Sequence, residues 1–219
     1  HGLADKLEVI NFQAAKLARE VAGDKAYVAG AIGPLGIRIE PWGKTSVEEA
    51  EAAFLEQARG LLAGGVDLFI LETFFDINEI HQAIKAVRSI TDKPIIASMT
   101  INEDGNALYG TSVDVFTPKL EAWGADVIGL NCSVGPKTMF DAIEKMRELS
   151  SLNMIAQPNA GLPKVVDGRM IYLCNPEYFG EYAKRFIQAG VRLIGGCCGT
   201  TPEHIKWVAN AVKALTPGG

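Results

Sequence analysis

The sequence lacks the features that mark several large classes of protein. Histidine occurs only three times, which disfavours a hydrolytic metal site built from several imidazoles. No uncharged apolar run approaches the roughly 18 residues typical of a membrane span, and the first residues lack the charged and apolar regions of a signal peptide. Lysine and arginine are scattered rather than clustered, so neither nucleic acid nor a membrane surface is an expected partner. A small-molecule substrate and a cytoplasmic location are expected instead.

Cysteine is also sparse. Four cysteines in 219 residues are too few for a disulfide scaffold, and in a reducing compartment cysteines at matched positions indicate metal binding or catalysis. Hydrophobic residues make up 48% of the chain, which is enough for a sizeable core, and the net charge is -5. Because no low-complexity linker interrupts the chain, residues 1–219 are expected to form one domain.

Apolar periodicity and capping signals divide the chain into alternating helices and strands. Strands are expected over 26–32, 67–73, 94–101, 125–131, 153–157 and 191–195. Helices are expected over 7–21 and 46–62, from Asp76 onward with Glu79 as a second capping residue, before Trp123, around 139–146, from Asn175 onward and from Thr200 or Thr201 onward. Near-continuous apolar strands between helices predict a parallel sheet covered by helices. A closed barrel and an open doubly wound sheet both satisfy this pattern.

Three similar segments, 65–70, 124–129 and 190–195, recur at intervals of roughly 60 residues. Each begins with a glycine and continues into an apolar run. Glycine is the usual residue at a helix C-terminus, so each segment predicts the end of a helix, a turn and a strand. The repetition indicates a fold built from repeated strand and helix units.

Three cysteines follow expected strands directly. Cys132 comes immediately after the run 125–131, and Cys197 and Cys198 follow the run 191–195 after Gly196. In parallel α/β sheets the functional residues gather at the C-terminal ends of the strands. Neighbouring side chains on a strand point to opposite faces, so the adjacent pair reaches one ion only if the backbone leaves the strand, which the flanking glycines permit. A disulfide within the pair is disfavoured because neighbouring Cα atoms are only about 3.8 Å apart.

Three thiolates at one rim suit Zn²⁺, and a catalytic zinc site has three protein ligands with the fourth position left for water or substrate. Such a shell is electron-rich, hence poor for hydrolysis, but coordination still deprotonates a bound thiol. The pattern therefore predicts alkylation of a thiol substrate. The alternative interpretation is that small buried cysteines merely pack the strand ends.

Three motifs carry a specific resemblance. The segments 195–204 (GGCCGTTPEH), 129–133 (GLNCS) and 71–74 (LETF) resemble the zinc-dependent homocysteine S-methyltransferase family, which includes the homocysteine-binding domain of methionine synthase and proteins fused to a methylenetetrahydrofolate reductase. The resemblance implies a (β/α)₈ TIM barrel with zinc held by Cys132, Cys197 and Cys198. L-Homocysteine would supply the fourth ligand through its thiolate and would be methylated to methionine, with no catalytic residue beyond the zinc site.

The resemblance also implies substrate-binding residues. Glu72 matches the family acid that holds the substrate amino group, although a solvated loop carboxylate is the alternative. Asn131 is expected to orient a zinc ligand and Asn159 to meet the amino-acid carboxylate, while both are also common turn residues. Cys174 is expected to be structural. His81 and His204 fall on expected helices, where exposure or capping is favoured over ligation.

The chain departs from the family pattern in having six strand and helix units. We therefore expect a barrel whose first two strands are missing, an N-terminally incomplete domain over 1–219. In the family the methyl donor is methylcobalamin loaded from methyltetrahydrofolate on further domains, betaine or a methylsulfonium compound, and the motifs here are most similar to bacterial folate-linked members. The alternative to an enzyme is a zinc-stabilised or catalytically incomplete barrel that binds a partner.

Overall fold

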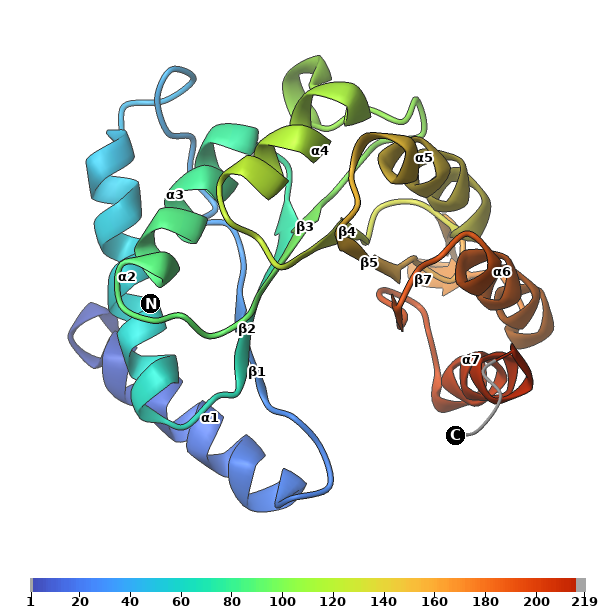
Figure 1. Ribbon diagram of the computed structural model, residues 1–219, viewed down its shortest axis with the longest axis horizontal. Helices are drawn as coiled ribbons and strands as arrows, with labels where there is room; N and C mark the ends of the chain where they lie inside the picture. The colour runs from blue at the N-terminus through green and yellow to red at the C-terminus, as the bar shows by residue number, and fades with distance from the viewer. Residues whose placement is uncertain (1, 216–219) are drawn as a thin grey trace.

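The computed structural model describes residues 2–215, which form a curled parallel sheet with helices around its outer side (Figure 1). The strands are β1 (Ala29–Ile32), β2 (Leu68–Phe74), β3 (Ile95–Met99), β4 (Val127–Asn131), β5 (Asn153–Gln157) and β8 (Leu193–Ile194), with a separate hairpin of β6 (Pro163–Val166) and β7 (Arg169–Tyr172). The helices are α1 (Leu7–Ala22), α2 (Val47–Ala63), α3 (Ile77–Arg88), α4 (Val113–Ala122), α5 (Pro136–Leu149), α6 (Pro176–Gln188) and α7 (Pro202–Leu215), with short 3-10 turns at Ala4–Lys6 and Leu108–Gly110.

The strand order distinguishes between the two expected architectures. The sheet runs β1-β2-β3-β4-β5-β8, and every neighbouring pair is parallel. A doubly wound sheet reverses its strand order at a switch point and carries helices on both faces, whereas a barrel keeps the order of the chain and carries helices outside. The chain is therefore a half-barrel with six strands of the TIM type, and the expected fold class is confirmed.

Two layers of apolar side chains cover the sheet. The main core fills the space between strands and helices, and its largest fully buried members include Phe54, Phe69, Phe74 and Phe116. A smaller cluster of Ile70, Ile96 and Ile155 lies on the other, concave face. Consecutive residues of a strand therefore pack into opposite layers, because their side chains point to opposite faces of the sheet. None of the helices within residues 2–215 has the length and apolarity needed to span a bilayer.

The expected helix starts are mostly confirmed. Ser46 and Glu49 form a capping box, and the side chains of Asp76 and Asn175 accept hydrogen bonds from the first turns of α3 and α6. The expectation for Glu79 was wrong. Its carboxylate accepts from the backbone N–H of Leu35 at 2.7 Å, so it anchors the β1–α2 loop rather than its own helix terminus.

The three repeated glycines occupy equivalent positions. Gly65, Gly124 and Gly190 have φ values of 91°, 91° and 89°, a left-handed conformation that favours glycine, and each lies between a helix and a strand. The interval seen in the sequence is therefore a structural repeat of two strand and helix units.

An ion pair accompanies the first two repeats. Arg19 in α1 donates to the carbonyl of Gly65 and pairs with Asp67, and Arg88 in α3 does the same with Gly124 and Asp126. In the third repeat an arginine stands where the aspartate would be, at position 192. The two ion pairs therefore connect α1 to the turn before β2 and α3 to the turn before β4.

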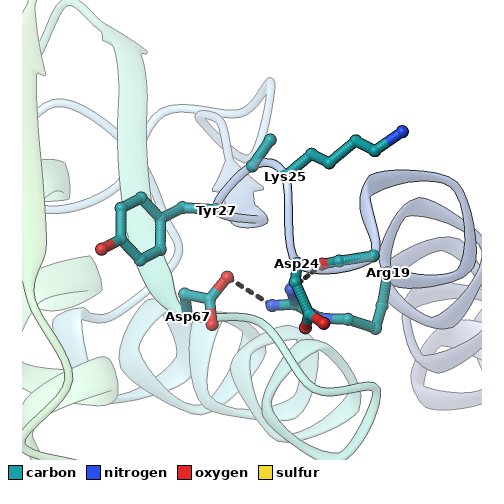
Figure 2. A pocket seen from close by; sticks show the side chains of 7 residues that line it. Arg19, Asp24, Lys25, Tyr27 and Asp67 are labelled. Carbon is teal, nitrogen blue, oxygen red and sulfur yellow. Dashed lines mark hydrogen bonds and ion pairs between the residues drawn. The ribbon is translucent and has the colours of Figure 1, made fainter.

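Figure 2 shows the first of these pairs beside a surface hollow of about 470 Å³. Arg19 and Asp67 line it together with Asp24, Lys25 and Tyr27. The residues that line the hollow come before β1 and β2 in the chain, so the hollow lies at the N-terminal ends of these strands. The cysteines were expected at the opposite end of the sheet. Because α/β sheets bind substrates at the C-terminal ends, this hollow is not the candidate active site.

Three features differ from the sequence-based expectation. The expected apolar stripe of α1 faces solvent, with Leu17 63% and Val21 82% exposed, and only Ala15 of this helix is buried. Strand β8 is limited to Leu193–Ile194, since the following glycines leave the sheet. The hairpin β6–β7 was not expected, because its residues are almost all exposed and lack the alternation that burial imposes.

Candidate metal and substrate site

The Cys132 thiol is positioned by a sharp turn after β4. Cys132 and Ser133 both have φ of 64°, a left-handed conformation that is uncommon for non-glycine residues. The N–H of Cys132 donates to the carbonyl of Gln157 at 3.0 Å, and the N–H of Val134 donates to the carbonyl of Cys132 at 2.8 Å. These bonds fix the turn at the C-terminal end of the sheet.

The adjacent cysteine pair is held by the loop that follows β5. The N–H of Cys197 donates to the carbonyl of Pro158 at 2.9 Å, while the N–H of Cys198 donates to the side-chain oxygen of Asn159 at 3.0 Å. The chain has left the strand at this point, and Gly199 adopts φ of 79°. The backbone departure that the glycines permitted is therefore what brings both thiols to one side.

The three sulfur atoms form a compact triangle. Those of Cys132, Cys197 and Cys198 all lie within 4.8 Å of one another, and the Cys132 and Cys198 sulfurs are 3.7 Å apart. A tetrahedral zinc with Zn–S bonds of about 2.3 Å places its sulfur ligands about 3.8 Å apart. The structure thus brings the three expected thiols together, and their spacing fits a single zinc ion.

The electrostatics of the triangle also favour a cation. Burial raises the pKa of the Cys132 thiol, and burial together with the neighbouring Cys132 raises the pKa of Cys197 to about 12. Crowded, half-buried thiols resist ionisation because each anion repels the next. A bound divalent cation removes that penalty, since its charge stabilises the thiolates.

Glu72 lies near the end of β2 and faces the concave side. It lies two residues after Ile70, a member of the concave cluster, so the two side chains face the same side of the sheet. The side chain of Glu72 is half-buried. No group within residues 2–215 donates a hydrogen bond to its carboxylate, and burial raises its pKa. A half-buried carboxylate without a donor is a suitable acceptor for a ligand ammonium group.

The two asparagines contact the backbone around the site. Asn131, 1% exposed, forms two hydrogen bonds with Thr73, the residue after Glu72. Asn159, 4% exposed, holds the N–H of Cys198 through its side-chain oxygen. Asn131 therefore joins the end of β4 to the end of β2, and Asn159 joins the loop after β5 to the turn that carries Cys198.

Tyr172 at the end of β7 is a site residue that sequence reasoning missed. Its ring packs on the Cys198–Gly199 turn, where a Cβ atom on Gly199 would lie 2.1 Å from the ring carbon Cγ. The pKa of Tyr172 is raised first by burial and then by the negative charge of the nearby Cys198. A tyrosine in an exposed hairpin carries no sequence signal for such a role, because the hairpin itself was not recognised.

Within residues 2–215, Cys174, His81 and His204 lie outside the triangle. Cys174 is half-buried and packs against the cluster between α6 and α7. His204 accepts from the N–H of Thr201 at 3.1 Å and contacts the carbonyl of Cys174 at 2.9 Å, so it caps α7 as expected. His81 stacks on Trp123 with ring centroids 3.9 Å apart, in place of full exposure.

Fold and site together define a TIM-type half-barrel with a three-thiol cluster at the C-terminal ends of its strands. Comparison with known proteins narrows this class. The family model described as homocysteine S-methyltransferase matches residues 1–212, and the chain belongs to that family.

The similar proteins agree with this assignment. The methionine synthases of Mycobacterium leprae and Mycobacterium tuberculosis are each 32% identical, over 100% and 98% of this chain. The chain spans 19% of the length of each of these relatives. Among solved structures, the apo homocysteine methyltransferase MmuM from Escherichia coli matches with a TM-score of 0.78 at 23% identity, covering 96% of this chain and 76% of its own. This last match concerns the fold alone.

Proposed function

We propose that the protein methylates the thiol of L-homocysteine to give methionine, with one zinc ion held by Cys132, Cys197 and Cys198. The observation that carries the proposal is the sulfur triangle, whose 3.7 Å edge fits tetrahedral zinc. Family membership and the two methionine synthase relatives support the choice of substrate. When bound, zinc would keep the substrate sulfur deprotonated while three thiolate ligands preserve its electron density.

The chain's own residues would bind and orient the amino acid. In this proposal Glu72 accepts the ammonium group, because its carboxylate lies half-buried without a donor from residues 2–215. Asn159 would direct its side-chain NH₂ toward the substrate carboxylate, while its oxygen holds Cys198. Asn131 would act on the substrate through Thr73 and Glu72. The substrate sulfur then attacks the methyl carbon in line, and the bond from that carbon to the donor breaks with its electron pair leaving on the donor.

The methyl donor is proposed to reside on other parts of a longer protein. The chain spans 19% of the methionine synthases it resembles, which leaves room there for further domains. Methylcobalamin loaded from methyltetrahydrofolate fits those relatives, and a fused reductase domain is the variant of this arrangement. A cytoplasmic setting belongs to the proposal, since three free thiols persist best in a reducing compartment.

Metal analysis combined with thiol titration tests the proposal. About one zinc per chain is expected from the three-ligand site, and Cys197→Ala should lose it. Cys174→Ala is the matched control, because Cys174 lies outside the sulfur triangle, and it should keep its zinc. Adding homocysteine to the zinc form should release a proton and add a fourth sulfur to the zinc-edge absorption spectrum.

The outcomes separate the two functional hypotheses. Zinc that binds but shows no fourth sulfur and no proton release with homocysteine would contradict the methyltransferase proposal. It would support the alternative, a zinc-stabilised or catalytically incomplete barrel that serves as a binding module. A wild-type protein without zinc affinity would contradict the methyltransferase proposal and the zinc-stabilised form of the alternative, and would leave the catalytically incomplete barrel as the remaining interpretation.

A further inference from the structure

A β-bulge near the end of β2 presents two consecutive polar side chains to the site. Leu71 pairs with Ala97 of β3, and Phe74 pairs with Met99. Two β2 residues, Glu72 and Thr73, therefore lie opposite the single β3 residue between these pairs. Thr73 takes up the extra length with φ of 65°, a conformation that β-branched residues strongly disfavour. As a result Leu71 and Phe74 both pack in the outer core, while Glu72 and Thr73 are left on the concave side.

Asn131 holds this bulge from β4, two strands away. Its side-chain oxygen accepts the N–H of Thr73 at 2.8 Å, and its side-chain NH₂ donates to the Thr73 hydroxyl at 2.8 Å. The backbone carbonyl of Asn131 accepts a hydrogen bond of 3.0 Å from the hydroxyl of Thr100. Thr100 directly follows β3, the strand that lies between β2 and β4. Asn131 is 1% exposed, so these bonds are partly or fully shielded from water and fix the local geometry.

The position of this pair in the chain gives it a role. Thr73 directly follows Glu72, and Asn131 directly precedes Cys132. The two hydrogen bonds are therefore a short rigid link between the proposed ammonium acceptor and the first residue of the thiol triangle. A disfavoured backbone conformation that is held by two partly buried hydrogen bonds is typical of a functional site.

We propose that Thr73 and Asn131 are positioning residues that set the distance between the Glu72 carboxylate and the thiol triangle, and so select thiols that carry an amino group at the matching spacing. This inference rests on the proposed function. Its specific consequence is that Thr73 controls recognition of the amino group without contacting the substrate and without holding the metal.

Binding of two ligands to the zinc-loaded protein tests the inference. Homocysteine and 4-mercaptobutyrate share the thiol and the carboxylate, and only homocysteine has the amino group. Thr73→Val removes the hydroxyl and strands the buried NH₂ of Asn131, so calorimetry should show homocysteine binding weakened about tenfold or more, as expected for a displaced charged contact. Binding of 4-mercaptobutyrate and the zinc content should be unchanged, and Thr73→Ser should retain the wild-type preference.

Two further variants keep the test decisive. Thr73→Gly suits the left-handed conformation and also lacks the hydroxyl, so it replaces Thr73→Val if that variant does not fold. In a Glu72→Gln background the Thr73 substitution should have little further effect on homocysteine, because the two residues act on the same contact. Equal weakening of both ligands, or none for either, would overturn the inference. Wild-type protein that binds zinc but neither thiol would instead contradict the proposed function.

Discussion

The ring of Tyr172 lies directly against the backbone of Gly199, at the turn that carries Cys198. Gly199 therefore meets two constraints, since its φ of 79° disfavours any side chain and the ring occupies the space of a Cβ atom. We expect Gly199→Ala to lower the free energy of unfolding by about 3 kcal/mol or more, through strain and overpacking together. It should also displace the Cys198 thiol and reduce zinc binding. Urea denaturation and zinc analysis measure the two effects.

Gly168 supplies the control for this substitution. It has φ of 73°, and no atom of residues 2–215 lies within 4 Å of the position that an alanine methyl group would take, so Gly168→Ala imposes backbone strain without the clash. A cost of about 1 to 2 kcal/mol is expected from strain alone, with zinc content unchanged. If both alanine variants behaved alike, the packing of Tyr172 on Gly199 would have no energetic role.

Tyr172→Phe examines the phenol itself. The negative charge of Cys198 contributes to the raised pKa of Tyr172, so the phenol stays protonated beside this proposed thiolate ligand and stabilises it through its hydroxyl. Removing it should weaken zinc binding by about tenfold in competition with a chromophoric chelator. Tyr27→Phe is the control, because Tyr27 is 87% exposed at the other end of the sheet. Unchanged zinc affinity in Tyr172→Phe would show that the ring acts only through packing.

The sequence predicted the repeated architecture well because glycines and buried strands carry strong local signals. Gly65, Gly124 and Gly190 are fixed by a backbone conformation that other residues avoid, so the repeat was visible without any tertiary information. The meeting of Cys132 with the Cys197–Cys198 pair followed from the rule that parallel strands end at one edge. Both inferences depend on regularities of the fold.

Other features depend on tertiary contacts that leave no local pattern. Glu79 matches a capping residue by spacing, yet it bonds Leu35 in a loop 44 positions away. Thr73 is a β-branched residue in a left-handed conformation, which its propensity opposes and only the contact with Asn131 explains. The solvent-facing stripe of α1 likewise departs from the burial that its periodicity indicates.

Asp67 should make the protein more sensitive to acid. The hydrogen bond and charge of Arg19, with the N–H of Val28 at 2.7 Å, hold the pKa of this carboxyl below its usual value. Its contribution to stability is therefore present at neutral pH and is lost as the pH falls below about 4. Asp67→Asn should lower the urea midpoint at pH 7 and converge with wild type in acid. A constant difference at all pH values would contradict an electrostatic origin.

Glu79 should have the opposite pH dependence. It is 6% exposed, and burial, together with the neighbouring Asp76, raises the pKa of its carboxyl. An acid with a raised pKa in the folded state costs stability when ionised, so that cost appears as the pH rises through the folded-state pKa and is absent below the unfolded-state value.

Glu79→Gln isolates this effect, because a glutamine oxygen can still accept the Leu35 N–H that now donates to the carboxylate at 2.7 Å. The variant should be more stable than wild type at pH 8, and the difference should shrink as the buffer is acidified. Thermal unfolding across a pH series measures both curves. A variant that is less stable at pH 8 would show that the charged form of the hydrogen bond to Leu35 outweighs the desolvation of the carboxylate.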